Sequence, residues 1–191
     1  MAPKQKHREP IINAAVTLFR RHGYAGTGLN DIVDESGAPK GSLYHYFPDG
    51  KVSIAESAVE TAGRRVVDTL TELSESNNNS GELLIAHAKL LAGWMEKSNF
   101  RDGCPMTTVL LELCPQERNV TMAARNAYTS QKDLITAKLV SDGHSVDRAE
   151  RLALLSVSAI QGALVQTRIQ RSRHPLTVVA EELAETLRLP A

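Results

Sequence analysis

Apolar residues recur along this chain at the spacing of one face of an α-helix. Near the N-terminus, Ile11, Ala15, Leu18 and Phe19 lie at positions i, i+4, i+7 and i+8. These positions share one side of a helix, and Gly23 supplies a stop because glycine readily takes the left-handed conformation found after helix ends. The pattern therefore predicts an amphipathic helix that ends at Gly23.

The same spacing continues through most of the sequence, where strand signals are scarce. The chain has 191 residues with only three Phe, four Tyr and one Trp, and Ala, Leu, Glu and Arg dominate the periodic segments. This composition favours an all-α protein of about nine helices that is long enough to bury a core. After the first helix, others are predicted at Leu29–Ser36, Lys40–Phe47, from Lys51 for about twenty residues to the polar linker Ser74–Gly81, and at Leu83–Met95, Met106–Leu113, Arg118–Val140, Asp147–Gln170 and Pro175–Leu187.

Two short helices are predicted on either side of Gly37. Thr27 is positioned to cap the first of them, as Asp147 with Glu150 is for a later helix. The second short helix is too short and too polar for a core helix, because it carries a cation, hydroxyls and aromatic donors around Leu43. Two short helices joined by a glycine-bearing turn are typical of a helix-turn-helix, which delivers such side chains into the DNA major groove.

This segment resembles the helix-turn-helix of the TetR family of bacterial transcriptional regulators. The resemblance covers about the first third of the chain, and the spacing from Phe47 to Lys51 is one residue longer than the usual F-x-x-K. It rests on Gly23-Tyr24, Thr27, Asp31-Ile32, Gly37, Lys40-Gly41-Ser42-Leu43-Tyr44, Phe47 and Lys51. With that insertion, Gly103-Cys104-Pro105, Ile160-Gln161-Gly162-Ala163-Leu164 and the stretch from Arg168 to Pro175 resemble the YxaF/LmrA-like subgroup.

The resemblance implies a DNA-binding head at residues 1–51 and a helical effector-binding and dimerisation body at residues 52–191. Lys40 can reach a phosphate or a guanine edge, and Gly41 lets the backbone approach DNA closely. Lys51 opens a helix whose N-terminus also attracts phosphate. The predicted DNA contacts are Thr27, Lys40, Gly41, Ser42, Tyr44, His45 and Lys51.

The net charge of the whole chain is zero, which by itself does not indicate a nucleic-acid partner. Its distribution changes the picture, because residues 1–51 hold seven Lys and Arg against five Asp and Glu, a net of +2, and the remainder carries −2. A basic excess of this size suits a modest set of phosphate contacts.

Other functional classes find little support in the sequence. The six histidines show no metal-ligand spacing and there is no glycine-rich phosphate loop, so we expect neither a metal, a cofactor nor an enzyme. Cys104 and Cys114 are too few for a disulfide framework or a zinc site. The chain shows no signal peptide and no apolar run near the ~20 residues of a membrane span, so we expect a cytoplasmic protein without membrane contact.

The body is predicted to hold a cavity for a small-molecule effector. Core packing is the alternative explanation for each apolar residue considered, and Cys104 also allows a redox-sensor role at a helix start. The candidate lining residues are Trp94, Met95, Phe100, Cys104, Met106, Leu110, Tyr128 and Gln161.

Together these features predict a homodimeric, ligand-responsive regulator, most simply a repressor that binds a palindromic double-stranded DNA operator. By resemblance, the last two long helices pair with their copies in a four-helix dimer interface, and an ordinary buried core is the alternative. A redox-sensing regulator of the same fold acting through Cys104 and an all-α interaction module that does not bind DNA both stay open.

Overall fold

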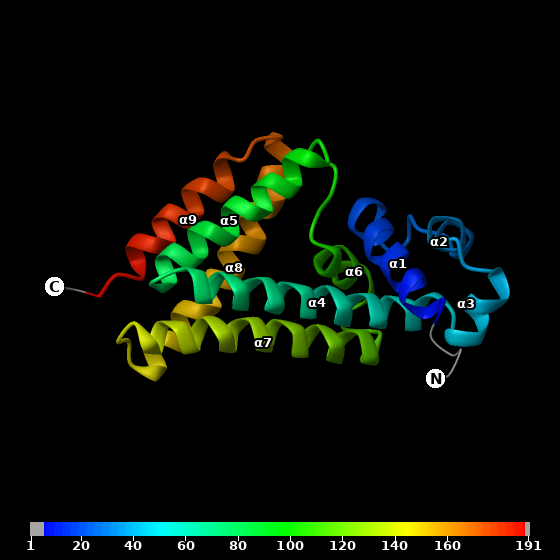
Figure 1. The fold of residues 1–191 in the computed structure, drawn as a ribbon, viewed down its shortest axis with the longest axis horizontal. Helices are drawn as coiled ribbons and strands as arrows, with labels where there is room; N and C mark the ends of the chain where they lie inside the picture. Colours follow the sequence, from blue (N-terminus) through cyan, green and yellow to red (C-terminus); the bar gives the residue numbers. More distant parts are fainter. Residues whose placement is uncertain (1–5, 190–191) are drawn as a thin grey trace. The chain divides into compact units, whose positions relative to one another are not determined.

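The computed structural model describes residues 6–189, and within them it contains nine α-helices and no strand (Figure 1). This confirms the all-α prediction. The helices are α1 (Arg8–His22), α2 (Leu29–Ser36), α3 (Lys40–Tyr46), α4 (Lys51–Ser76), α5 (Ser80–Lys97), α6 (Pro105–Leu113), α7 (Arg118–Ser141), α8 (Val146–Gln170) and α9 (His174–Thr186).

Two predicted helix starts are corrected by the structure. The residue that caps α2 is Gly28, whose N–H donates to Asp31 Oδ2 at 2.7 Å, and Thr27 lies one position before it. At α8 the cap is Ser145, whose side chain accepts from the N–H of Arg148, so the carboxylates downstream do not form the predicted capping box. At α8 the cap residue thus satisfies one free N–H of the first helical turn, and at α2 the Asp31 carboxylate instead satisfies the N–H of the cap residue itself.

The described chain divides into two compact units. The first runs up to Arg64 and also includes Cys104–Ala127, and the second comprises Arg65–Gly103 and the chain from Tyr128 onward. Both α4 and α7 therefore contribute one part to each unit. The division of function at residue 51 stays a prediction.

The first unit contains α1, α2, α3 and α6, with the adjoining parts of α4 and α7. Its core is formed by apolar residues that the helical spacing places on inward faces, among them Ile11, Phe19, Ile32, Leu43 and Ile54, each fully buried. Helix α6 packs against α1, and the two lie side by side in Figure 1. The three short N-terminal helices therefore share their core with a helix from the middle of the sequence.

The second unit is built on α5, α8 and α9, in which α9 packs against both of the others. The C-terminal end of α7 holds the turn between α4 and α5 from two sides. The Lys138 ammonium donates to the carbonyl of Asn77 at 2.8 Å, and the Asp142 carboxylate accepts from the N–H of Ser80 at 2.7 Å. A cation thus lies where α4 ends and an anion where α5 begins, as the helix dipoles favour.

Helix α8 is long and apolar enough to cross a membrane by length and composition alone. By that measure α8 is an exception to the expectation that no apolar run approaches the length of a membrane span. A single helix of this kind is weak evidence for a membrane, because core helices of soluble proteins pass the same test.

His87 on α5 is the titratable group most affected by the fold. Burial lowers the pKa of its imidazole from 6.5 to about 4. Between these pH values the unfolded chain binds a proton that the folded chain does not. The free energy of unfolding is therefore expected to fall as the pH falls through this window, by up to ~1.4 kcal/mol per pH unit from this residue.

Denaturant titrations at several pH values test this expectation. His87→Leu is expected to flatten the fall between pH 6.5 and 4, whereas His22→Gln, which changes an exposed histidine, is expected to keep it. An equally steep fall in the His87→Leu protein would assign the acid sensitivity to other groups.

Candidate nucleic-acid interface

The turn between α2 and α3 is held by its own polar groups. Gly37 has φ 63° and ψ 12°, the left-handed conformation, and its N–H donates to the Asp34 carbonyl. The Ser36 hydroxyl accepts from the N–H of Ala38 at 3.2 Å. Pro39 then directly precedes α3 as its cap residue, with ψ 136°. This sequence of conformations turns the chain sharply, as the predicted helix-turn-helix requires.

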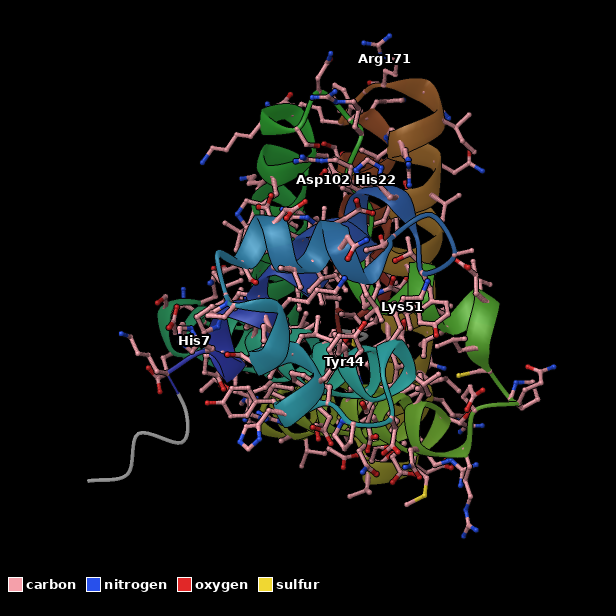
Figure 2. All side chains as sticks on the ribbon, turned by 90° about the vertical axis from the view of Figure 1, so that its right-hand side faces the viewer. His7, His22, Tyr44, Lys51, Asp102 and Arg171 are labelled. Atoms are coloured by element: carbon pink, nitrogen blue, oxygen red, sulfur yellow. The ribbon has the colours of Figure 1, made fainter. Side chains whose placement is uncertain are left out.

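Helix α3 has one buried side and one exposed side. Leu43 is fully buried, and Phe47 just beyond the helix is 2% exposed beneath the guanidinium of Arg8. Tyr44 is 50% exposed, and the side chain of His45 meets Tyr46 edge to face. Tyr44 is labelled on α3 in Figure 2, which faces α2 and α3. Lys40, Gly41, Tyr44 and His45 are all exposed, and Ser42 is half-buried.

Gly41 is not required by the packing of the protein itself. A Cβ added at this position would meet no atom within 4 Å. Glycine inside a helix costs about 1 kcal/mol relative to alanine. The structure thus gives no internal reason for a residue that lowers the stability of α3.

Thr27 is buried in the turn between α1 and α2. It is 1% exposed, its hydroxyl donates to the Gly23 carbonyl at 2.8 Å, and its N–H donates to the Tyr24 carbonyl at 3.2 Å. Both donors are therefore used within the protein. A contact of Thr27 with phosphate stays a prediction, and the geometry gives it no exposed donor.

Lys51 lies at the start of α4, with its ammonium directed into the same turn. Its Nζ donates to the carbonyls of Tyr24 and Thr27, each at 2.9 Å, and lies 4.1 Å from the centre of the Tyr24 ring. Desolvation lowers the pKa of the Lys51 ammonium, and the nearby Glu112 carboxylate acts in the opposite direction. Lys51 thus has a structural position in the head, and its predicted phosphate contact stays a prediction.

Sequence reasoning missed the role of Glu112 on α6. Its Oε1 accepts from the N–H of Tyr24 at 2.8 Å and its Oε2 from the N–H of Ala25 at 2.7 Å. About one turn earlier on the same helix face, the Thr108 hydroxyl donates to the carbonyl of Phe19 at 2.9 Å. No local signal indicates these contacts, because the partners are 87 to 89 residues apart in the sequence.

The predicted effector residues are divided between the two units. Cys104, Met106 and Leu110 belong to the first unit and the other five to the second. Met95 and Met106 are buried, Trp94 is 44% exposed, and Phe100, Cys104, Leu110, Tyr128 and Gln161 are half-buried. Both cysteines are free thiols. A cavity lined by this set stays a prediction.

The sequence matches two parts of one family of regulators. Residues 11–58 match the bacterial regulatory proteins of the tetR family, and residues 81–182 match the transcriptional regulator LmrA/YxaF-like C-terminal domain. Together the two matched segments include most of the chain and parts of both compact units.

Relatives and solved structures agree with these matches. An HTH-type transcriptional regulator of Mycobacterium tuberculosis is 34% identical over 188 residues, which are 96% of this chain and 95% of that protein. The HTH-type transcriptional regulator LmrA of Bacillus subtilis is 30% identical over 181 residues, 95% of this chain and 96% of that protein. The crystal structure of a regulatory protein TetR from Rhodobacter sphaeroides has a TM-score of 0.82 and 18% identity, covers 94% of this chain and 97% of its own, and shares the fold.

Proposed function

Because the chain belongs to the TetR family of bacterial transcriptional regulators and not to a family of enzymes, we propose that it is a homodimeric repressor of transcription. In this proposal it binds a palindromic operator in the cytoplasm and leaves it when a small organic effector binds the body. The observation that carries the proposal is the exposed side of α3, where a cation, a bare backbone position and two aromatic donors lie together: Lys40, Gly41, Tyr44 and His45.

An exposed apolar stripe on α8 supports the dimer. Leu154 is 60% exposed, Val165 50% and Ile169 68%, and the stripe between them includes Ser158 and Gly162. These five positions follow one another at intervals of three and four residues, so they share one face of the helix. Two copies related by a two-fold axis would bury this face against itself. Two α3 helices of the dimer would then read half-sites ~34–36 Å apart.

Unpaired polar atoms in the second unit support a ligand in the body. Gln131 is 3% exposed and Thr167 is fully buried, yet Gln131 Nε2 and Thr167 Oγ1 have no hydrogen-bond partner within the described residues. Leaving such a group unpaired costs about 1–3 kcal/mol. A ligand with a hydrogen-bond acceptor would remove that cost, which favours an effector that is not purely apolar.

Selection of bound duplexes from a random DNA pool tests the proposed function. The purified protein is expected to enrich one palindrome, and sedimentation of that complex is expected to show two protein chains, or four, per duplex. Enrichment of no sequence by folded protein would refute the proposal.

Replacing Lys40 by alanine is expected to weaken binding to the selected duplex by ~1–3 kcal/mol and to relax sequence preference at one position. Lys40 is exposed at the first turn of α3, so the variant keeps the fold. Fluorescence anisotropy with the selected duplex and its single-base variants measures both effects. A uniform loss across all duplexes would instead make Lys40 a phosphate contact.

Replacing Gly41 by alanine is expected to change stability and binding in opposite directions. The added methyl group meets open space in the protein and removes the helix cost of glycine, so the free energy of unfolding is expected to rise by about 0.5–1 kcal/mol. The same methyl group is expected to keep α3 from the DNA backbone and to weaken specific binding several-fold. Unchanged binding by the more stable variant would mean that DNA does not approach Gly41.

A further inference from the structure

Two charged side chains form hydrogen bonds with the backbone of the α1–α2 turn (Gly23–Gly28): an anion with its N–H groups and a cation with its carbonyls. The carboxylate of Glu112 accepts from two of its N–H groups, and the ammonium of Lys51 donates to two of its carbonyls. All of these atoms belong to the first compact unit. Hydrogen bonds of this kind, in which one partner is charged, are stronger than those between neutral groups.

This turn determines where α2 begins. Near its end, Thr27 uses both of its donors within the turn, and α2 starts two residues after Thr27, at Leu29. Helix α2 in turn packs against α3, which carries the exposed DNA-contact candidates. A shift of the turn therefore moves α2, and α3 moves with it because the two helices pack together.

The anionic side of this arrangement comes from α6 and not from the head. Thr108 and Glu112 lie four residues apart, on one face of α6, and their three hydrogen bonds join that helix to the end of α1 and to the turn. The fit at the turn is close, because a Cβ on Gly23 would lie 2.7 Å from Glu112 Oε1. The carboxylate thus lies against a bare stretch of backbone.

We propose that Glu112 is a positioning residue for DNA recognition: from α6 it fixes the α1–α2 turn, and through the turn it fixes the placement of α3. The inference rests on the proposed DNA-binding function. In the proposed role Glu112 itself contacts no base. Because it is an anion, it would not add to the attraction for phosphate, so its contribution is confined to the geometry that specific binding needs.

A comparison of specific binding with binding to a random duplex tests the proposal. Glu112→Gln keeps the size of the side chain but turns an NH₂ group toward a backbone N–H, so one hydrogen bond is lost. The variant is expected to bind the selected duplex about tenfold more weakly while binding a random duplex as well as the wild type or slightly better. A defect confined to stability would instead lower both affinities by the same factor, since it lowers only the amount of folded protein.

Glu117→Gln is the matched control. Burial raises the pKa of Tyr24 most, and the Glu117 and Glu112 carboxylates each raise it further, so both carboxylates act on the same site. No described hydrogen bond joins the Glu117 carboxylate to the turn. The control is expected to keep the ratio of specific to random-duplex affinity, and an equal loss in both variants would overturn the proposal in favour of a general charge effect.

Two further measurements test the inference, and the first of them does not depend on the folding of Glu112→Gln. Thr108→Val removes the other contact of α6 with the end of α1 and is expected to lower the same ratio. Amide hydrogen exchange at Tyr24 and Ala25 is expected to accelerate in Glu112→Gln, and unchanged exchange with an unchanged affinity ratio would overturn the proposal. Wild-type protein that selects no duplex would contradict the proposed function instead, so the two failures are distinguishable.

Discussion

Replacing Ile169 by glutamate is expected to convert the proposed dimer into monomers and to weaken operator binding by at least about 100-fold. Ile169 is 68% exposed on the apolar stripe of α8, so the substitution disturbs little within the subunit itself. In a two-fold interface the same position occurs on both subunits, so one substitution introduces two carboxylates. An unpaired charge buried there costs several kcal/mol.

The loss of DNA affinity follows from the loss of the second head. A dimer binds its second half-site as an intramolecular event, and such linkage raises affinity by about 10²–10⁴-fold without any new contact. Sedimentation equilibrium measures the association, and gel shift with the selected duplex measures the affinity. Val146→Glu is the control, because Val146 is also exposed on α8, at 61%, but lies in the first turn and off the stripe.

The control is expected to remain dimeric and to bind the operator normally. A carboxylate in the first turn of a helix is favoured by the helix dipole, so this variant should also fold well. If Ile169→Glu instead sediments as a dimer with full operator affinity, the interface lies elsewhere and the stripe on α8 has another partner.

The helices could be predicted because each one shows its buried face in its own sequence. Leu29–Ser36 was predicted with both ends correct, since Gly37 stops it by a local conformational preference. The predicted helix at Met106–Leu113 begins one residue earlier, at Pro105, a residue suited to a first turn. The spacing of apolar residues, together with glycine and proline residues at helix ends, thus indicates where most of the helices begin and end.

The candidate site was predictable only where its chemistry is local. Exposure of Lys40, Tyr44 and His45 follows from Leu43 being the buried residue of a short helix, and the structure has that arrangement. The position of Lys51 was not predictable in this way, because its ammonium is held by carbonyls 24 and 27 residues earlier. The contacts of Glu112 were missed for the same reason.

The apolar surface of α8 was predictable only in part. The sequence analysis left open whether this helix pairs with its copy or is an ordinary core helix. In the structure, α8 has one buried apolar face and a second, exposed one, the stripe with Leu154, Val165 and Ile169. The sequence therefore reveals an excess of apolar surface. The surface that covers the stripe depends on how copies of the chain associate, and the experiment on Ile169 addresses this.

Replacing Gly23 by alanine is expected to lower the free energy of unfolding of the first unit by about 2–4 kcal/mol and to weaken specific DNA binding at least tenfold. Gly23 has φ 78° and ψ 177°, a conformation that residues with a side chain rarely adopt and that costs them ~1–3 kcal/mol. The added Cβ would also lie 2.7 Å from Glu112 Oε1. The carboxylate can move away, but it then loses its hydrogen bonds to the turn, each worth about 0.5–1.5 kcal/mol.

Two comparisons separate the strained backbone from the displaced carboxylate. Gly37→Ala places a methyl group on another glycine with a positive φ, 63° with ψ 12°, where a Cβ meets nothing within 4 Å, so it reports a backbone cost of positive φ without a displaced carboxylate. In a Glu112→Ala background the carboxylate is already absent, and the effect of Gly23→Ala on unfolding is expected to shrink toward that of Gly37→Ala. Denaturant unfolding of the four proteins and of the wild type measures this cycle. Additive effects of Gly23→Ala and Glu112→Ala would show that Glu112 does not lie against Gly23 in solution. The carboxylate would then not fix the position of the turn.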